Sequence, residues 1–464
     1  MQFSRGANTE SLSEAYRSVP LPSTGGWLKR FLAFAGPAYL VSVGYMDPGN
    51  WGTDLGGGSQ FGYSLLWVIL VSNLFAQLLQ VLCARLGLVT GKDLAQACRD
   101  YYSKPVAIAL WVLCEAAIIA CDLAEVIGSA VALNLLFHIP LVWGVLITGF
   151  DVLLLLGLGK WGFRKLEAVV ITMVATIAIC FLINIVLARP DWASVANGLF
   201  VPRIPNRDAL LVSVGILGAT VMPHNLYLHS SLVQSRATKQ TPDGIRSAIQ
   251  NNTWDTIIAL SMAFFVNAAI LILSAAVFHQ AGQKVEELQD AYKLLSPALG
   301  GVSATLFAVA LLASGQSSTI TGTLAGQIVM EGFLNLRVNP WVRRMITRTI
   351  AIVPAFGIVW YTRGTGTVDL LIWSQVVLSM QLSFAIFPLL SFTSNKVLMG
   401  EFVNPSWVKI VGLAVCFLIA GLNIYFLFTK LSPWAVILAL GAIGGFWLAV
   451  KLFYKNPNRP QMSV

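Results

Sequence analysis

Charged residues are scarce in this sequence. Lys, Arg, Asp and Glu together make up 11% of its 464 residues, whereas soluble domains carry about 25%. Hydrophobic residues make up 56%, and a soluble protein of this length could not cover so much apolar surface with so few charges. A soluble enzyme, a disordered chain and a coiled coil are therefore excluded, because each requires a more polar sequence.

Two further patterns are missing. The six cysteines show no C-x-x-C spacing and mostly lie in apolar runs, so we interpret them as packing residues rather than disulfide partners. The first 27 residues are polar and contain no apolar stretch, so we expect no signal peptide. The chain also lacks the alternating ten-residue segments that are typical of a membrane β-barrel.

Long apolar runs dominate the chain instead. Most of them are long enough to cross the ~30 Å hydrocarbon core of a bilayer as helices. The sequence therefore predicts an all-α polytopic membrane protein with about twelve transmembrane helices. The twelve segments centre on residues 34–58, 64–85, 106–135, 140–158, 167–188, 209–234, 256–278, 298–325, 342–361, 368–391, 407–428 and 433–453.

The positive charges are distributed unevenly between the two sides of the membrane. With the N-terminus inside, 23 of the 30 Lys and Arg residues fall in inside stretches and 7 in outside loops. This bias predicts that both termini are cytoplasmic. The net charge of +9 thus reflects topology, and no basic tract is dense enough to indicate nucleic-acid binding. Short loops favour a multi-pass protein of the cell membrane (plasma or inner).

Two of the predicted helices are interrupted by proline in mid-membrane. Residues 44–51 read GYMDPGNW, and residues 218–225 read GATVMPHN. Proline removes a backbone donor and clashes with the preceding turn, and unwound backbone is tolerated at this depth only where it lines protein or water. Interrupted segments at matching places in two halves of a chain indicate a transporter site.

The two breaks are five segments apart, which sets the organisation of the chain. Because five is odd, the second unit of five helices starts from the opposite side of the membrane, and the repeats are inverted. We therefore expect two inverted five-helix repeats and two added helices between short tails. The boundaries are 1–27 for the N-terminal tail, 28–190 and 191–395 for the repeats, 396–455 for the added helices and 456–464 for the C-terminal tail.

Asp47, Asn50 and Met222 are the candidate ligands at these breaks. A carboxylate near the bilayer centre is costly unless it is paired or solvated, so Asp47 is interpreted as a cation ligand. The alternative is that Asp47 only caps the helix that restarts at Pro48, and the alternative for Met222 is ordinary core packing. A carboxylate, an amide and one soft sulfur suit a borderline divalent transition metal better than Mg²⁺ or Ca²⁺.

At these residues the sequence resembles the Nramp family of proton-coupled divalent metal ion transporters. The matching motifs are DPGN at 47–50, MPH at 222–224 and the polar stretch from Gly315 to Gly332. The resemblance implies a LeuT-like fold, with Asp47, Asn50, Met222 and the carbonyl of Ala219 as metal ligands. It suggests Gln375 as an additional ligand, and it places a backbone carbonyl of the site at Gly44, where many relatives carry Ala.

The third predicted helix carries three acids on one stripe, Glu115, Asp122 and Glu125, at spacings of seven and three. One interpretation is a structural, ion-paired stripe. The other, which the family suggests, is a proton route that also uses Asp47. Arg344 and Arg348 in the ninth segment are the candidate partners of the acids.

His224 and His229 follow the second break. Two interpretations apply to each of them: a hydrogen-bonded structural histidine, or part of a polar lining that tunes protonation near Asp47.

The predicted function is secondary active import of divalent transition metal ions with protons, by alternating access. Mn²⁺ is the first choice as substrate, with Fe²⁺, Cd²⁺ and Co²⁺ also compatible, and no resident cofactor is expected. The predicted partners are metal ions, protons and the lipid bilayer, without an obligate protein partner. The alternatives are a LeuT-fold symporter for an organic substrate and an Mg²⁺-type relative. An enzyme is not predicted, because no HExxH motif or cluster of catalytic ligands is present.

Overall fold

The computed structural model describes residues 11–12, 15–21, 26–149, 163–285, 287–336, 340–362, 366–430, 441 and 445. Within these ranges every regular element is a helix, apart from one isolated β-bridge between Val19 and Arg236. The first half of the chain contains α1 (Trp27–Phe34), α2 (Pro37–Ser42), η1 (Val43–Met46), α3 (Pro48–Phe61), η2 (Gly62–Leu65), α4 (Leu66–Thr90), α5 (Leu94–Tyr101), α6 (Lys104–Phe137), α8 (Phe163–Ala188) and α9 (Trp192–Phe200).

The second half continues with another set of helices. They are α10 (Arg207–Thr220), α11 (Pro223–Leu232), η3 (Val233–Ser235), α12 (Pro242–Ser274), the π-helical turn η4 (Ala275–His279), α13 (Leu288–Leu299), α14 (Gly301–Leu334), α15 (Pro340–Thr362), α16 (Thr367–Thr393), α17 (Lys396–Met399), η5 (Gly400–Phe402) and α18 (Ser406–Lys430). Residues 141–149 are also helical.

The described part of the chain holds nine helical stretches that are long and apolar enough to span a membrane. This confirms a multi-pass, all-α membrane protein. The predicted segment at 433–453 lies outside the described residues, and the segment at 140–158 is described only as far as residue 149.

The polar stretch from Gly315 to Thr323 lies within α14, which continues to Leu334. The predicted segment stopped at residue 325, because Gln327 and Glu331 lower the hydropathy of the last turns without ending the helix. Gln327 Nε2 donates to Glu331 Oε1 across one turn, at 2.9 Å.

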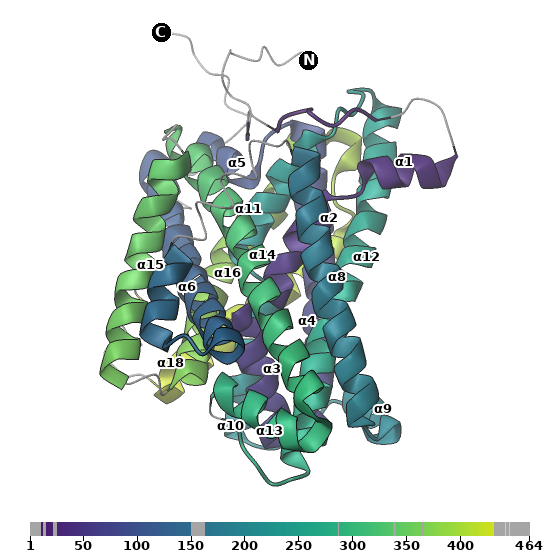
Figure 1. The fold of residues 1–464 in the computed structure, drawn as a ribbon. Helices are drawn as coiled ribbons and strands as arrows, with labels where there is room; N and C mark the ends of the chain where they lie inside the picture. Colours follow the sequence, from purple (N-terminus) through teal and green to yellow (C-terminus); the bar gives the residue numbers. More distant parts are fainter. Residues whose placement is uncertain are drawn as a thin grey trace.

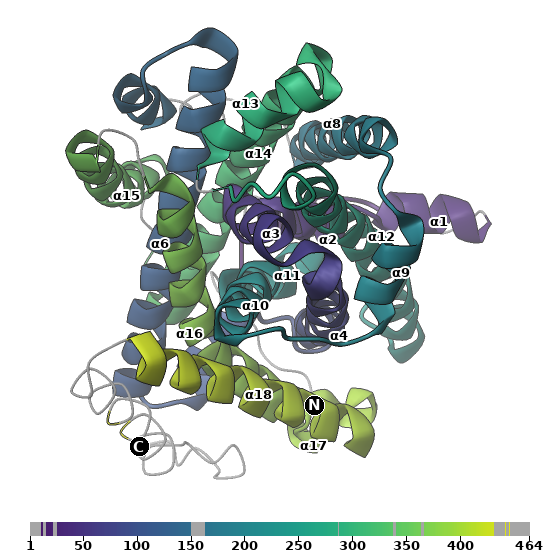
Figure 2. The ribbon, with the colours of Figure 1, turned by 90° about the horizontal axis from the view of Figure 1, so that it is seen from below.

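The two interrupted segments lie at the centre of the bundle. In Figure 1, α2 lies above α3 while α10 lies below α11, so the two segments run in opposite directions. Figure 2 shows α2, α3, α10 and α11 enclosed by α6 and α16 on one side and by α4, α8 and α12 on the other, with α18 and α15 outside. This antiparallel pair of broken helices is what inverted repeats predict.

Each break occurs at the residue before proline, because proline disfavours the helical conformation for its predecessor. Asp47 (φ −67°, ψ 166°) and Met222 (φ −77°, ψ 124°) are both extended. A glycine on α6 allows close packing at the first break, because a Cβ at Gly128 would lie 2.3 Å from Pro48 Cβ. The restarted helix α3 therefore packs directly on the α6 backbone.

Candidate metal site

The break in the first segment places Asp47 and Asn50 side by side. Asp47 Oδ1 accepts hydrogen bonds from the Asn50 backbone N at 2.9 Å and from Asn50 Nδ2 at 2.7 Å. Asp47 therefore does cap α3, as the structural alternative proposed, but the cap uses only one carboxylate oxygen. Both side chains are buried, at 0% and 1% exposure, so the second oxygen, Oδ2, points into the protein interior.

The second break brings its backbone to the same point. Asn50 Nδ2 donates to the Ala219 carbonyl at 3.2 Å and to the Gly44 carbonyl at 3.4 Å. Three oxygens, from Asp47, Gly44 and Ala219, thus converge on one amide group. A 180° rotation of that amide would turn the Asn50 oxygen toward the same point. The arrangement is a cluster of oxygen donors built from both broken helices.

Met222 and Gln375 complete this group of predicted residues. Met222 is fully buried and belongs to a small cluster with Ala117, Cys121 and Leu378. Gln375 lies against the start of α3, since a Cβ at Gly49 would meet its Nε2 at 1.7 Å. Its Oε1 is buried and has no hydrogen-bond partner among the described residues, so this oxygen is available as a donor beside the break.

Gly44 has a spatial reason to lack a side chain here. A Cβ at this position would lie 2.2 Å from Asn225 Nδ2. Asn225 itself is fully buried, and neither polar atom of its side chain has a hydrogen-bond partner among the described residues. Asn225 was not predicted as a site residue, although its place two residues after Pro223, like that of Asn50 after Pro48, was a usable signal.

The acid stripe on α6 pairs with an arginine from α15. Arg348 Nη1 lies 3.1 Å from Glu125 Oε2 and 3.7 Å from Asp122 Oδ1, and all three side chains are buried. Ser318 and Thr319 of α14 also donate to Glu125, at 2.8 and 3.0 Å. These contacts bring the predicted partners together, and they are compatible with both a structural stripe and a proton route.

The remaining predicted polar residues lie in different settings. Glu115 accepts from Trp111 Nε1 at 3.1 Å, nearer the start of α6. The side chain of Arg344 lies outside the described residues. His229 is held by Gln80 at 2.9 Å and Asn252 at 3.3 Å, which supports the structural interpretation of that histidine. His224 is buried, and its Nδ1 has no partner among the described residues.

Cys121 links the metal-site residues to the acid stripe, and sequence reasoning missed it. Its Sγ lies 3.8 Å from Asp47 Oδ2 and 3.7 Å from Glu125 Oε1. No sequence signal distinguished it from the other buried cysteines, because the contact with Asp47 spans 74 residues of chain.

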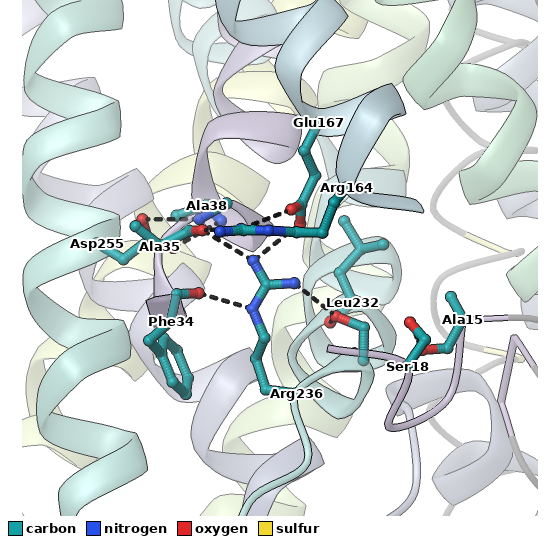
Figure 3. Close-up of polar contacts among 12 residues, drawn as sticks. Ala15, Ser18, Phe34, Ala35, Ala38, Arg164, Glu167, Leu232, Arg236 and Asp255 are labelled. Atoms are coloured by element: carbon teal, nitrogen blue, oxygen red, sulfur yellow. Dashed lines mark hydrogen bonds and ion pairs between the residues drawn. The ribbon is translucent and has the colours of Figure 1, made fainter. Parts of the chain in front are cut away.

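A buried ionic network closes the other end of the first segment (Figure 3). Arg236 follows η3 and donates to the carbonyls of Phe34 at 2.7 Å and Ala35 at 2.9 Å. It also pairs with Glu167 of α8 at 2.9 Å. Asp255 of α12 accepts from the backbone of Gly36 and Ala38. The start of the broken helix is thereby tied to three other helical segments.

A terminal segment covers the same face. Residues 15–21 run beside the chain that follows η3, where Val19 N donates to Ser235 O at 3.0 Å and Ala237 N donates to Val19 O at 2.9 Å. Ser11 Oγ lies 2.7 Å from Ser231 Oγ. We call residues 11–12 and 15–21 the N-terminal strap.

The described residues contain no group of three or more His, Cys, Asp or Glu placed to hold a metal ion. The site is instead a mixture of carbonyl, amide, carboxylate and thioether groups. Such a mixture suits an ion that must be released again better than a permanently bound one.

Comparisons with known proteins identify the family of the chain. Residues 38–429 match the Nramp family, described as natural resistance-associated macrophage protein-like. The divalent metal cation transporter MntH of Nostoc sp. is 56% identical over 432 residues, covering 92% of this chain and 98% of the relative. The MntH of Xanthomonas campestris is 57% identical over 418 residues, covering 89% and 94%.

Solved structures give the same result for the fold. A crystal structure of the Eremococcus coleocola manganese transporter superposes with a TM-score of 0.86 at 41% identity, covering 96% of this chain and 97% of that one. The nucleobase-cation-symport-1 transporter Mhp1 superposes with a TM-score of 0.60 at 14% identity, covering 96% of each chain. The latter likeness concerns the LeuT-like fold alone. On these matches, which cover nearly all of its membrane helices, the chain belongs to the Nramp family of membrane transporters and is not an enzyme.

Proposed function

We propose that this protein imports Mn²⁺ and related divalent transition metal ions together with protons. The observation that carries the proposal is the convergence of Asp47, Asn50 and the Ala219 carbonyl beside Met222, at two helix breaks that are buried in the bundle. The relatives named above are metal cation transporters, which supports the same assignment.

The donor set suits the proposed substrates. Asp47 supplies the negative charge, and the amide and carbonyl oxygens replace part of the hydration shell of the ion. The Met222 thioether favours borderline and soft ions and offers nothing to Mg²⁺ or Ca²⁺. Mn²⁺ and Fe²⁺ tolerate both kinds of ligand, so they fit this mixture. The thioether also argues against an Mg²⁺-type transporter.

Release of the ion requires the buried site to open to one side at a time. The network around Arg236 holds the first segment closed on the face where the Lys and Arg residues concentrate, which we assign to the cytoplasm. Opening toward the cytoplasm would separate the α1–α2 region from Arg236, Glu167 and Asp255. We also propose that both termini lie on this side of the cell membrane and that 28–190 and 191–395 are the inverted repeats.

The proton is proposed to use the acid stripe of α6. A divalent cation favours the ionised form of Asp47, so a proton bound there leaves when metal binds. Glu125 and Asp122 are the next proton acceptors along the proposed route, and both form ion pairs with Arg348. Glu115 continues the stripe toward the start of α6, and His224 is the candidate histidine beside it.

The test is Mn²⁺ uptake by the purified full chain in sealed liposomes, with and without an inward proton gradient. Uptake should be faster with the gradient, and internal acidification should follow added metal. Asp47→Asn should abolish uptake, because Asp47 supplies the carboxylate at the break itself. Asp290→Asn is the control, since Asp290 is 41% exposed and pairs with Lys293 one turn away on α13. Robust Mn²⁺ uptake by the Asp47→Asn protein would contradict the site assignment.

A further inference from the structure

The Cys121 thiol is the feature of the metal site that the donor set described above does not use. Cys121 is 2% exposed on α6 and packs in one cluster with Met222. Its Sγ faces Asp47 Oδ2, the carboxylate oxygen that does not cap α3, at 3.8 Å. The thiol therefore donates to the free carboxylate oxygen, and the Met222 side chain packs in the same cluster as the thiol.

The separation of the thiol and the carboxylate oxygen discriminates between coordination geometries. With metal–sulfur and metal–oxygen bonds of about 2.3 and 2.1 Å, two ligands lie about 3.6 Å apart at a tetrahedral angle and about 3.1 Å apart at the right angle of an octahedron. The observed 3.8 Å is close to the tetrahedral value. An ion between these two atoms would bind both without a change in the backbone, provided that it accepts tetrahedral coordination.

We propose that Cys121 is an additional ligand for thiophilic ions that favour tetrahedral coordination, with Zn²⁺ as the foremost case. Such an ion binds Cys121 Sγ together with Asp47 Oδ2 and the Met222 thioether. Mn²⁺ instead takes the oxygen-rich set around Asn50 and Ala219, because carboxylate and carbonyl oxygens suit Mn²⁺ better than a thiolate does. The inference rests on the proposed function, since it concerns a second binding mode of the same site.

The carboxylates of Asp47 and Glu125 beside Cys121 disfavour a free thiolate, so only the positive charge of a bound metal ion would stabilise the deprotonated sulfur here. Zinc binds the deprotonated sulfur, so a proton must leave the thiol when the bond to the metal forms. Glu125 Oε1 lies 3.7 Å from Sγ and is the group that would accept this proton. An ion held by thiolate, carboxylate and thioether leaves the site slowly, so Zn²⁺ should act as an inhibitor of Mn²⁺ uptake rather than as a good substrate.

The first test compares two cysteine variants in the liposome assay. Replacing a group one shell away from a metal typically costs ~10–100-fold in affinity, so loss of a direct ligand should cost at least about tenfold. We expect the ratio of the Zn²⁺ inhibition constant to the Mn²⁺ half-saturation concentration to rise by at least that factor in Cys121→Ser and Cys121→Ala. Cys114→Ser is the matched control, because Cys114 is equally buried on α6 and should leave the ratio unchanged.

The second test uses the unaltered protein and is independent of transport. Titration with Cd²⁺, a spectroscopic substitute for Zn²⁺, should produce an ultraviolet thiolate-to-metal absorption band, which Zn²⁺ abolishes by displacement. Absence of the band, or an unchanged inhibition ratio in both Cys121 variants, would overturn the inference. Failure of the proposed function looks different, because Mn²⁺ uptake would then be missing from the unaltered chain.

Discussion

Replacing Arg236 by alanine should loosen the start of the first broken helix. The guanidinium is fully buried, pairs with Glu167 and donates to the carbonyls of Phe34 and Ala35. Removing one partner of a buried ion pair costs about 3–5 kcal/mol. If these contacts exist only while the face that we assign to the cytoplasm is closed, the equilibrium should shift toward the open state by roughly 10²- to 4 × 10³-fold, since about 1.4 kcal/mol corresponds to a factor of ten.

Amide hydrogen exchange is a direct assay for this change, because it reports the free energy of local opening. Exchange over residues 34–42 should accelerate by about the same factor in Arg236→Ala, in the limit where reclosing is fast. Arg246→Ala is the matched control: Arg246 pairs with Glu401 on the same face, but both are exposed, at 65% and 49%, and such pairs contribute about 0–1 kcal/mol. Equal exchange in the two variants over 34–42 would refute the argument that this network holds the face closed.

Three further predictions concern selectivity, coupling and pH. Met222→Ala should retain some Mn²⁺ uptake while admitting Ca²⁺ or Mg²⁺, since the thioether is what these ions avoid; unchanged discrimination in a competition assay would place selectivity elsewhere. Glu125→Gln and Asp122→Asn should reduce metal-driven proton flux more than metal affinity, measured by liposome acidification and calorimetry, and the opposite result would assign these acids to the metal site. Burial raises the pKa of Asp93, at the loop before α5, to about 6. Its neutral form is therefore favoured in the folded state, so thermal stability in detergent should fall as pH rises from about 4 to about 6, and this fall should be smaller in Asp93→Asn, which keeps the helix cap.

The sequence predicted the features that depend on local chemistry. Proline in an apolar run weakens the helix at that point, so both breaks and the candidate ligands beside them were accessible. An arginine in the apolar run of α15 is expected to pair with acids, and Arg348 does pair with Asp122 and Glu125. Helix ends were less accessible, as α12 shows: it begins at Pro242, well before the apolar run predicted at 256–278, because its first turns are polar and carry no hydropathy signal.

Features that depend on long-range packing were not accessible in the same way. Glu167, Arg236 and Asp255 are ordinary charged residues far apart in the sequence, and only the fold brings them to one point. The contact of Cys121 with Asp47 and the crowding of Asn225 against Gly44 have the same origin. A single sequence gives each residue's chemistry but not its distant neighbours, so such contacts follow from tertiary structure alone.

The N-terminal strap has a consequence for how the protein would respond to events in the cytoplasm. Because the strap pairs with the chain beside Arg236, its docking and the closure of that face are linked equilibria. Linkage is reciprocal: whatever free energy the docked strap contributes to the closed face, closure contributes to docking. With that face on the cytoplasmic side, as proposed, a cytoplasmic protein that bound the strap would shift the transporter toward the open state and metal release. Conversely, closure of the face around bound metal would weaken the binding of that protein to the strap.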